Sequence, residues 1–197
     1  MKDLIKFCFL FFLFVIASCK KESAKTITDE ISFRYYNLEN AGWKSKNHTE
    51  IVDNIGFTGT EVPIQYYLLK DMGKSDLIKV DSIYEQNKRE RVIEFTFADD
   101  SEDDLLKEKY TKLDYESSVK YMSFKMQNDF YVVTQKKDTI KCSGSLFERS
   151  FKIAPQNKIM LYFSDIAPED KIQLVYNDKL FKKGILKFNF SDPILKL

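Results

Sequence analysis

The sequence is poor in the residues that most enzymes use for chemistry. It has one histidine, three cysteines and one tryptophan in 197 residues. A single histidine, His48, excludes a metal site built on two histidines, and its polar neighbours predict a solvated loop rather than a general base. The spacings HExxH, CxxC and GxSxG and a glycine-rich phosphate loop are also missing. We therefore predict no catalytic residue, no metal and no cofactor, and we lean against an enzyme.

The N-terminal segment has the clearest pattern in the chain. Lys2 and Lys6 give a basic start, an apolar run covers residues 7–16, and Ala17 and Ser18 precede Cys19. This order is typical of a secretory signal peptide. The apolar run is too short for a membrane-spanning helix, which takes about 20 residues. We predict a signal peptide over residues 1–18.

The four residues Ile16-Ala17-Ser18-Cys19 resemble the lipobox of bacterial lipoproteins. This resemblance implies a diacylglyceryl group on the thiol of Cys19, cleavage before that residue and acylation of the new amino group. Two or three acyl chains anchor a protein stably, because each buried methylene contributes about 0.8 kcal/mol. We expect a short polar tether over residues 19–28 and one globular domain over residues 29–197.

The composition and the residues after Cys19 resemble those of exported proteins of the Bacteroidota. The chain is rich in phenylalanine and lysine and has only six glycines, and residues 20–23 partly match the charged surface-export signals of that group. The resemblance implies a lipoprotein of the cell envelope, anchored in the outer membrane and facing the periplasm or the surface.

The predicted domain carries no net charge. The chain has a formal charge of +1, and the signal peptide accounts for it through Lys2, Asp3 and Lys6. Nucleic-acid binding needs a basic stripe, and binding to anionic lipid needs a polybasic patch. We therefore predict no nucleic-acid partner and no basic patch.

The cysteines exclude an internal disulfide in the mature domain. Cys8 leaves with the signal peptide and Cys19 is expected to carry lipid, so Cys142 is left alone. Its strand-like surroundings predict burial as a small apolar residue.

Alternating apolar residues predict a mostly β fold of the α+β class. Ile93, Phe95 and Phe97 alternate with polar residues, and similar short runs follow Asp129. We predict an antiparallel β-sandwich or open barrel with about three inserted helices, near 61–72, 100–112 and 114–127. The strands are expected at 31–38, 51–58, 78–80, 91–98, 130–134, 139–142, 146–153, 158–163, 172–176 and 185–190.

The acidic segment 99–104 allows two interpretations. Carboxylates at the start of a helix interact favourably with the helix dipole, and Ser101 with Asp104 resembles a capping box. Oxygen ligands also suit calcium, but the order of an EF-hand loop is missing. We favour the helix start over a weak calcium site.

Two further groups of residues are candidate sites. Trp43, with Tyr35 and Tyr36, could stack on a sugar or contact a partner protein, although a tryptophan folded over the core edge is the commoner arrangement. Ser82 and Thr139 lie in Asp-Ser/Thr-aliphatic triplets that resemble O-glycosylation sites of exported Bacteroidota proteins, which implies exposed positions.

Three functions remain open from the sequence. The first is a non-catalytic accessory or protein-binding module on a membrane anchor, and it predicts an exposed apolar patch. The second is a lipoprotein that binds a carbohydrate or small ligand through loop aromatics, and it predicts a concave site. The third, a hydrolase with two carboxylates across a groove, comes last because no such pair stands out.

Overall fold

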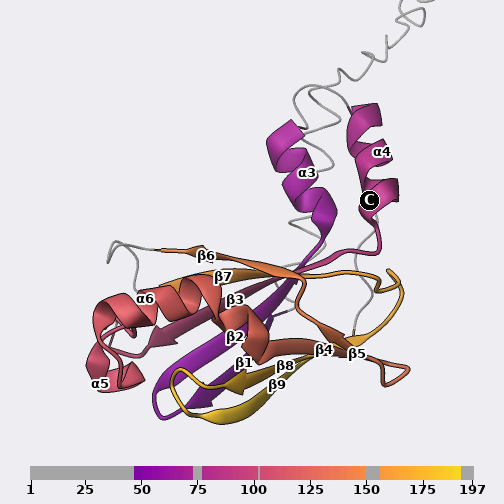
Figure 1. Cartoon of the computed structure of the whole chain (residues 1–197). Helices are drawn as coiled ribbons and strands as arrows, with labels where there is room; N and C mark the ends of the chain where they lie inside the picture. The colour runs from indigo at the N-terminus through magenta and orange to yellow at the C-terminus, as the bar shows by residue number, and fades with distance from the viewer. Residues whose placement is uncertain (1–46, 73–76, 102, 150–155, 192–197) are drawn as a thin grey trace, which may run out of the picture.

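Two antiparallel sheets form the body of the domain (Figure 1). The computed structural model describes residues 47–72, 77–101, 103–149 and 156–191. The first sheet contains, in spatial order, β1 (Asn47–Val52), β2 (Ile55–Val62), β3 (Arg91–Asp99), β7 (Gln156–Phe163) and β6 (Gly144–Glu148). The second contains β5 (Thr139–Lys141), β4 (Phe130–Thr134), β8 (Ile172–Asp178) and β9 (Gly184–Phe190). The predicted fold class is confirmed.

The two sheets meet along both of their long edges. On one side, only Cys142 and Ser143 separate β5 of the second sheet from β6 of the first. On the other side, the backbone N–H of Asn189 in β9 donates to Nδ1 of His48 in β1 at 3.2 Å. The strands therefore run almost completely around a single core, between a sandwich and an open barrel.

Strand β3 shows how the sequence builds this core. Ile93, Phe95 and Phe97 are fully buried between the sheets, while Glu94 and Thr96 are half-buried on the outer face. Full burial of one such apolar side chain contributes about 1.5–3 kcal/mol. The period-two alternation thus decides which face of the strand is turned inward.

In the part of the chain that the structure describes, four helices and one 3-10 turn lie at the two ends of the sheets (Figure 1). They are α3 (Ile64–Met72), α4 (Leu77–Asn87), α5 (Glu108–Thr111), α6 (Tyr115–Phe124) and η2 (Met126–Asp129). Helices α3 and α4 project from the body as a pair and share a small cluster of Val62, Leu69 and Val80. Helix α6 packs on the core through the buried Met122, and η2, which follows it, contributes the buried Met126.

The strand predicted at residues 78–80 is wrong, because this segment begins α4. The apparent alternation of Ile78 and Val80 does not correspond to a shared face, since Ile78 is 83% exposed and Val80 is 2% exposed. Val80 and Tyr84 are both buried and lie four residues apart, which is the spacing of one face of a helix and not of a strand.

Two predicted helices begin later than expected. Strand β2 continues past Gly59 to Val62, and α3 starts after Pro63, because Glu61 pairs with Ile93 in the sheet. The helix expected over 100–112 is reduced to α5. Backbone N–H groups ahead of α5 donate to nearby carboxylates instead of forming a helix, as the N–H of Leu106 does to Asp104 Oδ1 at 3.0 Å.

Three smaller differences concern strand ends and loops. The single strand expected over 51–58 is wrong, because a turn at Asp53 and Asn54 separates β1 from β2. The solvated loop predicted around His48 is wrong, because His48 lies in β1. Strand β6 begins at Gly144 rather than Leu146 and is described to Glu148. The strand predicted over 31–38 lies outside the described residues.

A buried ion pair connects β2, β3 and the loop before β8. The side chains of Arg91 and Glu61 are 0% and 2% exposed, and Arg91 Nη1 donates to Glu61 Oε1 at 2.5 Å. Arg91 Nη2 donates to the carbonyls of Ala167, Pro168 and Asp170 at 2.5, 3.1 and 2.9 Å. One guanidinium therefore fixes the path of a loop more than seventy residues away in sequence.

Replacing Arg91 with methionine should lower the free energy of unfolding by about 3–5 kcal/mol, because the buried Glu61 carboxylate loses its guanidinium. Urea denaturation measures this change. Arg89→Met is the matched control: its guanidinium contacts the same loop at Asp165 but is 56% exposed, so the loss should stay below about 1 kcal/mol. Equal losses in the two variants would contradict the structural role of Arg91.

Gly59 allows the two sheets to approach each other, and valine at this position should destabilise the protein by about 1–3 kcal/mol. A Cβ atom on Gly59 would lie 3.2 Å from Phe190 Cζ and 3.6 Å from Phe188 Cγ. In Gly56→Val, the control on the same strand, the nearest atom is the Ala98 carbonyl oxygen at 3.8 Å. Thermal unfolding should show a loss for Gly59→Val alone, and a similar loss in both variants would contradict this reasoning.

Candidate functional site

The structure tests few of the site residues predicted from sequence. Cys19, Tyr35, Tyr36 and Trp43 lie outside the described residues. Ser82 on α4 and Thr139 on β5 are both exposed, as a modified side chain requires. O-glycosylation at these two positions stays a prediction.

Both ring nitrogens of His48 are engaged within the fold. Nε2 lies 2.9 Å from Glu50 Oε1, and Nδ1 accepts from the backbone of Asn189. The ring also packs edge-on against Phe188 at 5.6 Å between centroids. These contacts give His48 a structural role at the junction of β1 and β9.

In the acidic segment 99–104, the charge of Asp103 is compensated by two lysines. Glu102 lies outside the described residues. Asp103 pairs with Lys107 and, at 2.5 Å, with Lys109, and hydrogen bonds from Lys107 and then Lys109 hold the pKa of Asp103 well below its usual range. Within the described ranges, no three His, Cys, Asp or Glu side chains are grouped to hold a metal ion.

Cys142 is half-buried at the crossing between the two sheets. Burial raises the pKa of its thiol, and the Sγ atom lies 3.0 Å from the carbonyl oxygen of Gly144. A thiol with a raised pKa is a weak nucleophile at neutral pH. The sequence predicts burial of this cysteine as a small apolar residue, and the structure leaves Cys142 half-buried against the edge of the core.

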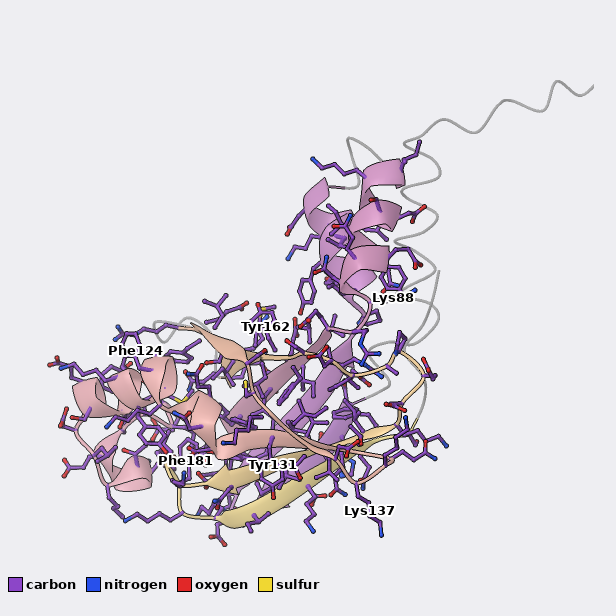
Figure 2. All side chains as sticks on the ribbon, turned by 45° about the vertical axis from the view of Figure 1, so that its right-hand side comes forward. Lys88, Phe124, Tyr131, Lys137, Tyr162 and Phe181 are labelled. Atoms are coloured by element: carbon purple, nitrogen blue, oxygen red, sulfur yellow. The ribbon has the colours of Figure 1, made fainter. Side chains whose placement is uncertain are left out.

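Five lysines converge on a hollow of about 550 Å³ between α6 and the turn that joins β8 to β9. We call this feature the lysine hollow. Its lysines are Lys112, Lys120, Lys125, Lys179 and Lys182. The residues of α6 and the β8–β9 turn lie at the same end of the domain, near the labels of Phe124 and Phe181 in Figure 2.

The connection between α5 and α6 forms one wall of the lysine hollow. Lys112 ends α5 in the left-handed conformation with φ 61°. The hydroxyls of Thr111 and Ser118 lie 2.8 Å apart and are buried, so they hold the connection against α6. Asp114 caps α6 by accepting from the backbone N–H of Ser117 at 2.9 Å.

A buried carboxylate organises the opposite wall. Asp178 Oδ1 accepts from the backbone N–H groups of Leu180 and Phe181 at 3.0 and 2.9 Å, and Oδ2 accepts from the backbone N–H of Lys183 at 2.9 Å. The Tyr176 hydroxyl also donates to Asp178 at 2.7 Å. These bonds shape the turn that carries the hollow's last two lysines.

A second buried carboxylate holds two of the residues that line the hollow, Tyr121 and Lys179. Asp129 is 1% exposed and accepts from Tyr121 Oη at 2.6 Å and from Lys179 Nζ at 2.7 Å. Burial, followed by the bond to Asp129, raises the pKa of Tyr121 well above its ordinary value. The phenol therefore remains a neutral donor to Asp129.

Positive charge exceeds negative charge inside the lysine hollow. Glu116 pairs with Lys120 at 2.8 Å, and Asp129 pairs with Lys179 at 2.7 Å. Lys112 Nζ donates to the carbonyl of Lys109 at 3.0 Å, which carries no net charge. Within the described ranges, neither Lys125 nor Lys182 has a hydrogen-bond or ion-pair partner for its ammonium. Such a site attracts anions.

The expectation of no basic patch is therefore wrong at this place. Net neutrality describes the sum of the charges, whereas the fold brings lysines together from segments about seventy residues apart in sequence. The run of lysines at 179, 182 and 183 was the one available signal, but the sequence alone does not show that α6 faces it.

Other surfaces offer weaker candidate sites. A shallower hollow of about 400 Å³ at the end of the second sheet has only Lys171 as a charged lining residue. Glu94 and Glu148 both contact Lys158, at 3.7 and 2.9 Å, which makes them part of an ion-pair network rather than an open acidic pair. The exposed large apolar residues come from six different segments: Ile51, Ile78, Leu113, Phe124, Leu146 and Ile185.

Comparison with known proteins adds little to this geometry. No family model and no curated protein matches the sequence. A solved structure of a DUF4426 family protein from Pseudomonas aeruginosa aligns with 76% of this chain and 95% of its own, at a TM-score of 0.39 and 8% identity. None of the helices among the described residues is both long and apolar enough to span a bilayer.

Tyr121→Phe should make the fold less sensitive to alkaline pH. The pKa of Tyr121 is raised in the folded state, so its contribution to stability is complete below the unfolded value of about 10 and is lost as the pH rises above it. Urea denaturation between pH 8 and pH 11 measures this effect. The free energy of unfolding should fall less steeply in the variant, and identical slopes would contradict this account.

Proposed function

We propose that this chain is a membrane-anchored lipoprotein of the cell envelope whose domain is a non-catalytic binding module. The observation that supports binding is the lysine hollow, in which five lysines line a space of about 550 Å³. Spaces of about 300–1,000 Å³ are typical of small-molecule sites. This favours a small ligand over a docked partner protein.

The anchor rests on the sequence of the first nineteen residues. The basic start, the apolar run and Cys19 after two small residues resemble a lipoprotein signal throughout. A tether on the lipidated residue would hold the domain at the membrane surface without a spanning helix.

A non-catalytic role is supported by the way the ionisable groups are used. The only histidine of the chain joins β1 to β9, and the Cys142 thiol has a raised pKa. The buried carboxylates Asp129 and Asp178 accept hydrogen bonds from lysine, tyrosine and backbone donors. Each of these groups therefore serves the fold.

Cys19→Ser tests the anchor in a diderm host. The wild-type protein should partition into detergent with the membranes and carry acyl mass on residue 19, and the variant should lose both. Intact-mass analysis and detergent partition measure these outcomes, and protease treatment of whole cells reports which side the domain faces.

Cys142→Ser is the matched control, because it removes the other cysteine of the predicted mature chain. This variant should keep its acyl mass and its membrane partition. Wild-type protein without acyl mass, or a Cys19→Ser variant that behaves like the wild type, would rule out the anchor.

A further inference from the structure

We propose that the lysine hollow binds a phosphate-bearing ligand, with the ammonium groups of Lys112, Lys125 and Lys182 as its main contacts. The inference rests on the proposed binding function and names the ligand class for that site. The ligand chemistry is an anionic phosphate group, either on a soluble molecule or on a lipid headgroup.

The ammonium groups available in the hollow come from three sides. Lys112 follows α5, Lys125 follows α6, and Lys182 belongs to the β8–β9 turn. The lining contains no arginine, whose planar fork suits carboxylate and phosphate alike. Lysines act as point charges, and a tetrahedral phosphate offers acceptor oxygens in several directions. Donors that arrive from three elements fit a phosphate better than a planar carboxylate.

The hydroxyl groups in the hollow are already used within the fold. Ser117 Oγ donates to Asp114 at 2.6 Å and Tyr121 Oη donates to Asp129 at 2.6 Å. The hollow therefore presents charged donors rather than neutral ones, so its selectivity should follow the charge of the ligand.

Two of the three contact lysines occupy backbone conformations that favour glycine. Lys112 and Lys182 have φ of 61° and 59°. Asp53, Asn54 and Asp165 also have positive φ, but asparagine and aspartate tolerate this region more readily than other side chains. Glycine at either position would therefore remove the ammonium group and relieve the backbone at the same time, which makes it a mild substitution for testing the charge.

Lys137 supplies the matched control for both positions. It also has positive φ, 69°, and it is exposed in the β4–β5 turn. Figure 2 shows Lys137 at the opposite end of the domain from Phe181 and Phe124. Lys112→Gly, Lys182→Gly and Lys137→Gly each remove one charge and relieve one strained backbone, but only the first two alter the hollow.

The test uses the full lipidated protein in neutral detergent at low salt. Titration calorimetry with inorganic pyrophosphate should show binding to the wild type and to Lys137→Gly at equal affinity. Lys112→Gly and Lys182→Gly should each bind about tenfold more weakly, since a hydrogen bond to a charged group is worth about one order of magnitude in affinity. Unchanged thermal unfolding of the variants excludes loss of the fold.

Site-specific amine labelling identifies the source of the phosphate. The protein is placed in phosphatidylcholine vesicles with or without phosphatidylglycerol, and mass spectrometry follows the labelling of Lys125 and Lys182 against Lys137. Protection by added pyrophosphate indicates a soluble ligand, and protection by phosphatidylglycerol alone indicates a headgroup; either result supports the proposal.

Two outcomes would overturn the inference. One is that neither pyrophosphate nor phosphatidylglycerol binds or protects the wild-type protein. The other is that Lys137→Gly weakens binding as much as the two variants in the hollow, which would indicate general charge attraction. The acyl mass on Cys19 is independent of both outcomes, so the anchor and the ligand class can fail separately.

Discussion

The contact between the two sheets depends on Phe95. Its ring, fully buried on β3, meets Phe57 and Phe97 of its own sheet and Phe130, Tyr176 and Phe188 of the other, with centroids between 4.9 and 6.4 Å apart. Tilted and edge-on contacts of this kind add to the gain from burial and restrict how the rings can be arranged. A side chain in contact with so many neighbours allows only one relative placement of the sheets, and the ends of the sheets follow from that placement.

The aromatic core also positions the carboxylates of the lysine hollow. Phe130 and Tyr176 stack at 4.4 Å with their planes 9° apart, which aligns β4 with β8. Asp129 precedes Phe130 and Asp178 follows Tyr176 by two residues, so the stacked pair brings both buried acids to one end of the domain. One acid holds Lys179 and Tyr121, and the other shapes the β8–β9 turn. The candidate site is therefore built outward from the core.

The sequence predicts the strands better than it predicts the site, for a physical reason. Burial on one face of a strand leaves a period-two pattern in the sequence. Ile93, Phe95 and Phe97 show this pattern in β3, and similar alternation indicates the strands after Asp129. The pattern fails at α4, where Ile78 and Val80 alternate by chance. The hollow has no such pattern, because its lysines come from separate segments and their positions depend on tertiary packing.

The neutral net charge of the domain and its cationic hollow are compatible. Attraction between charges in salt solution extends only about 8–10 Å, so an anion responds to the local balance and not to the total. Among the acids of the segment 99–104, Asp103 already forms ion pairs with Lys107 and Lys109. Asp178, the buried acid nearest in sequence to Lys182, is occupied by backbone N–H groups and a tyrosine. The fold therefore uses Asp129 and Asp178 to build the surroundings of the hollow, and among the described residues the ammonium groups of Lys125 and Lys182 are left without an ion-pair partner.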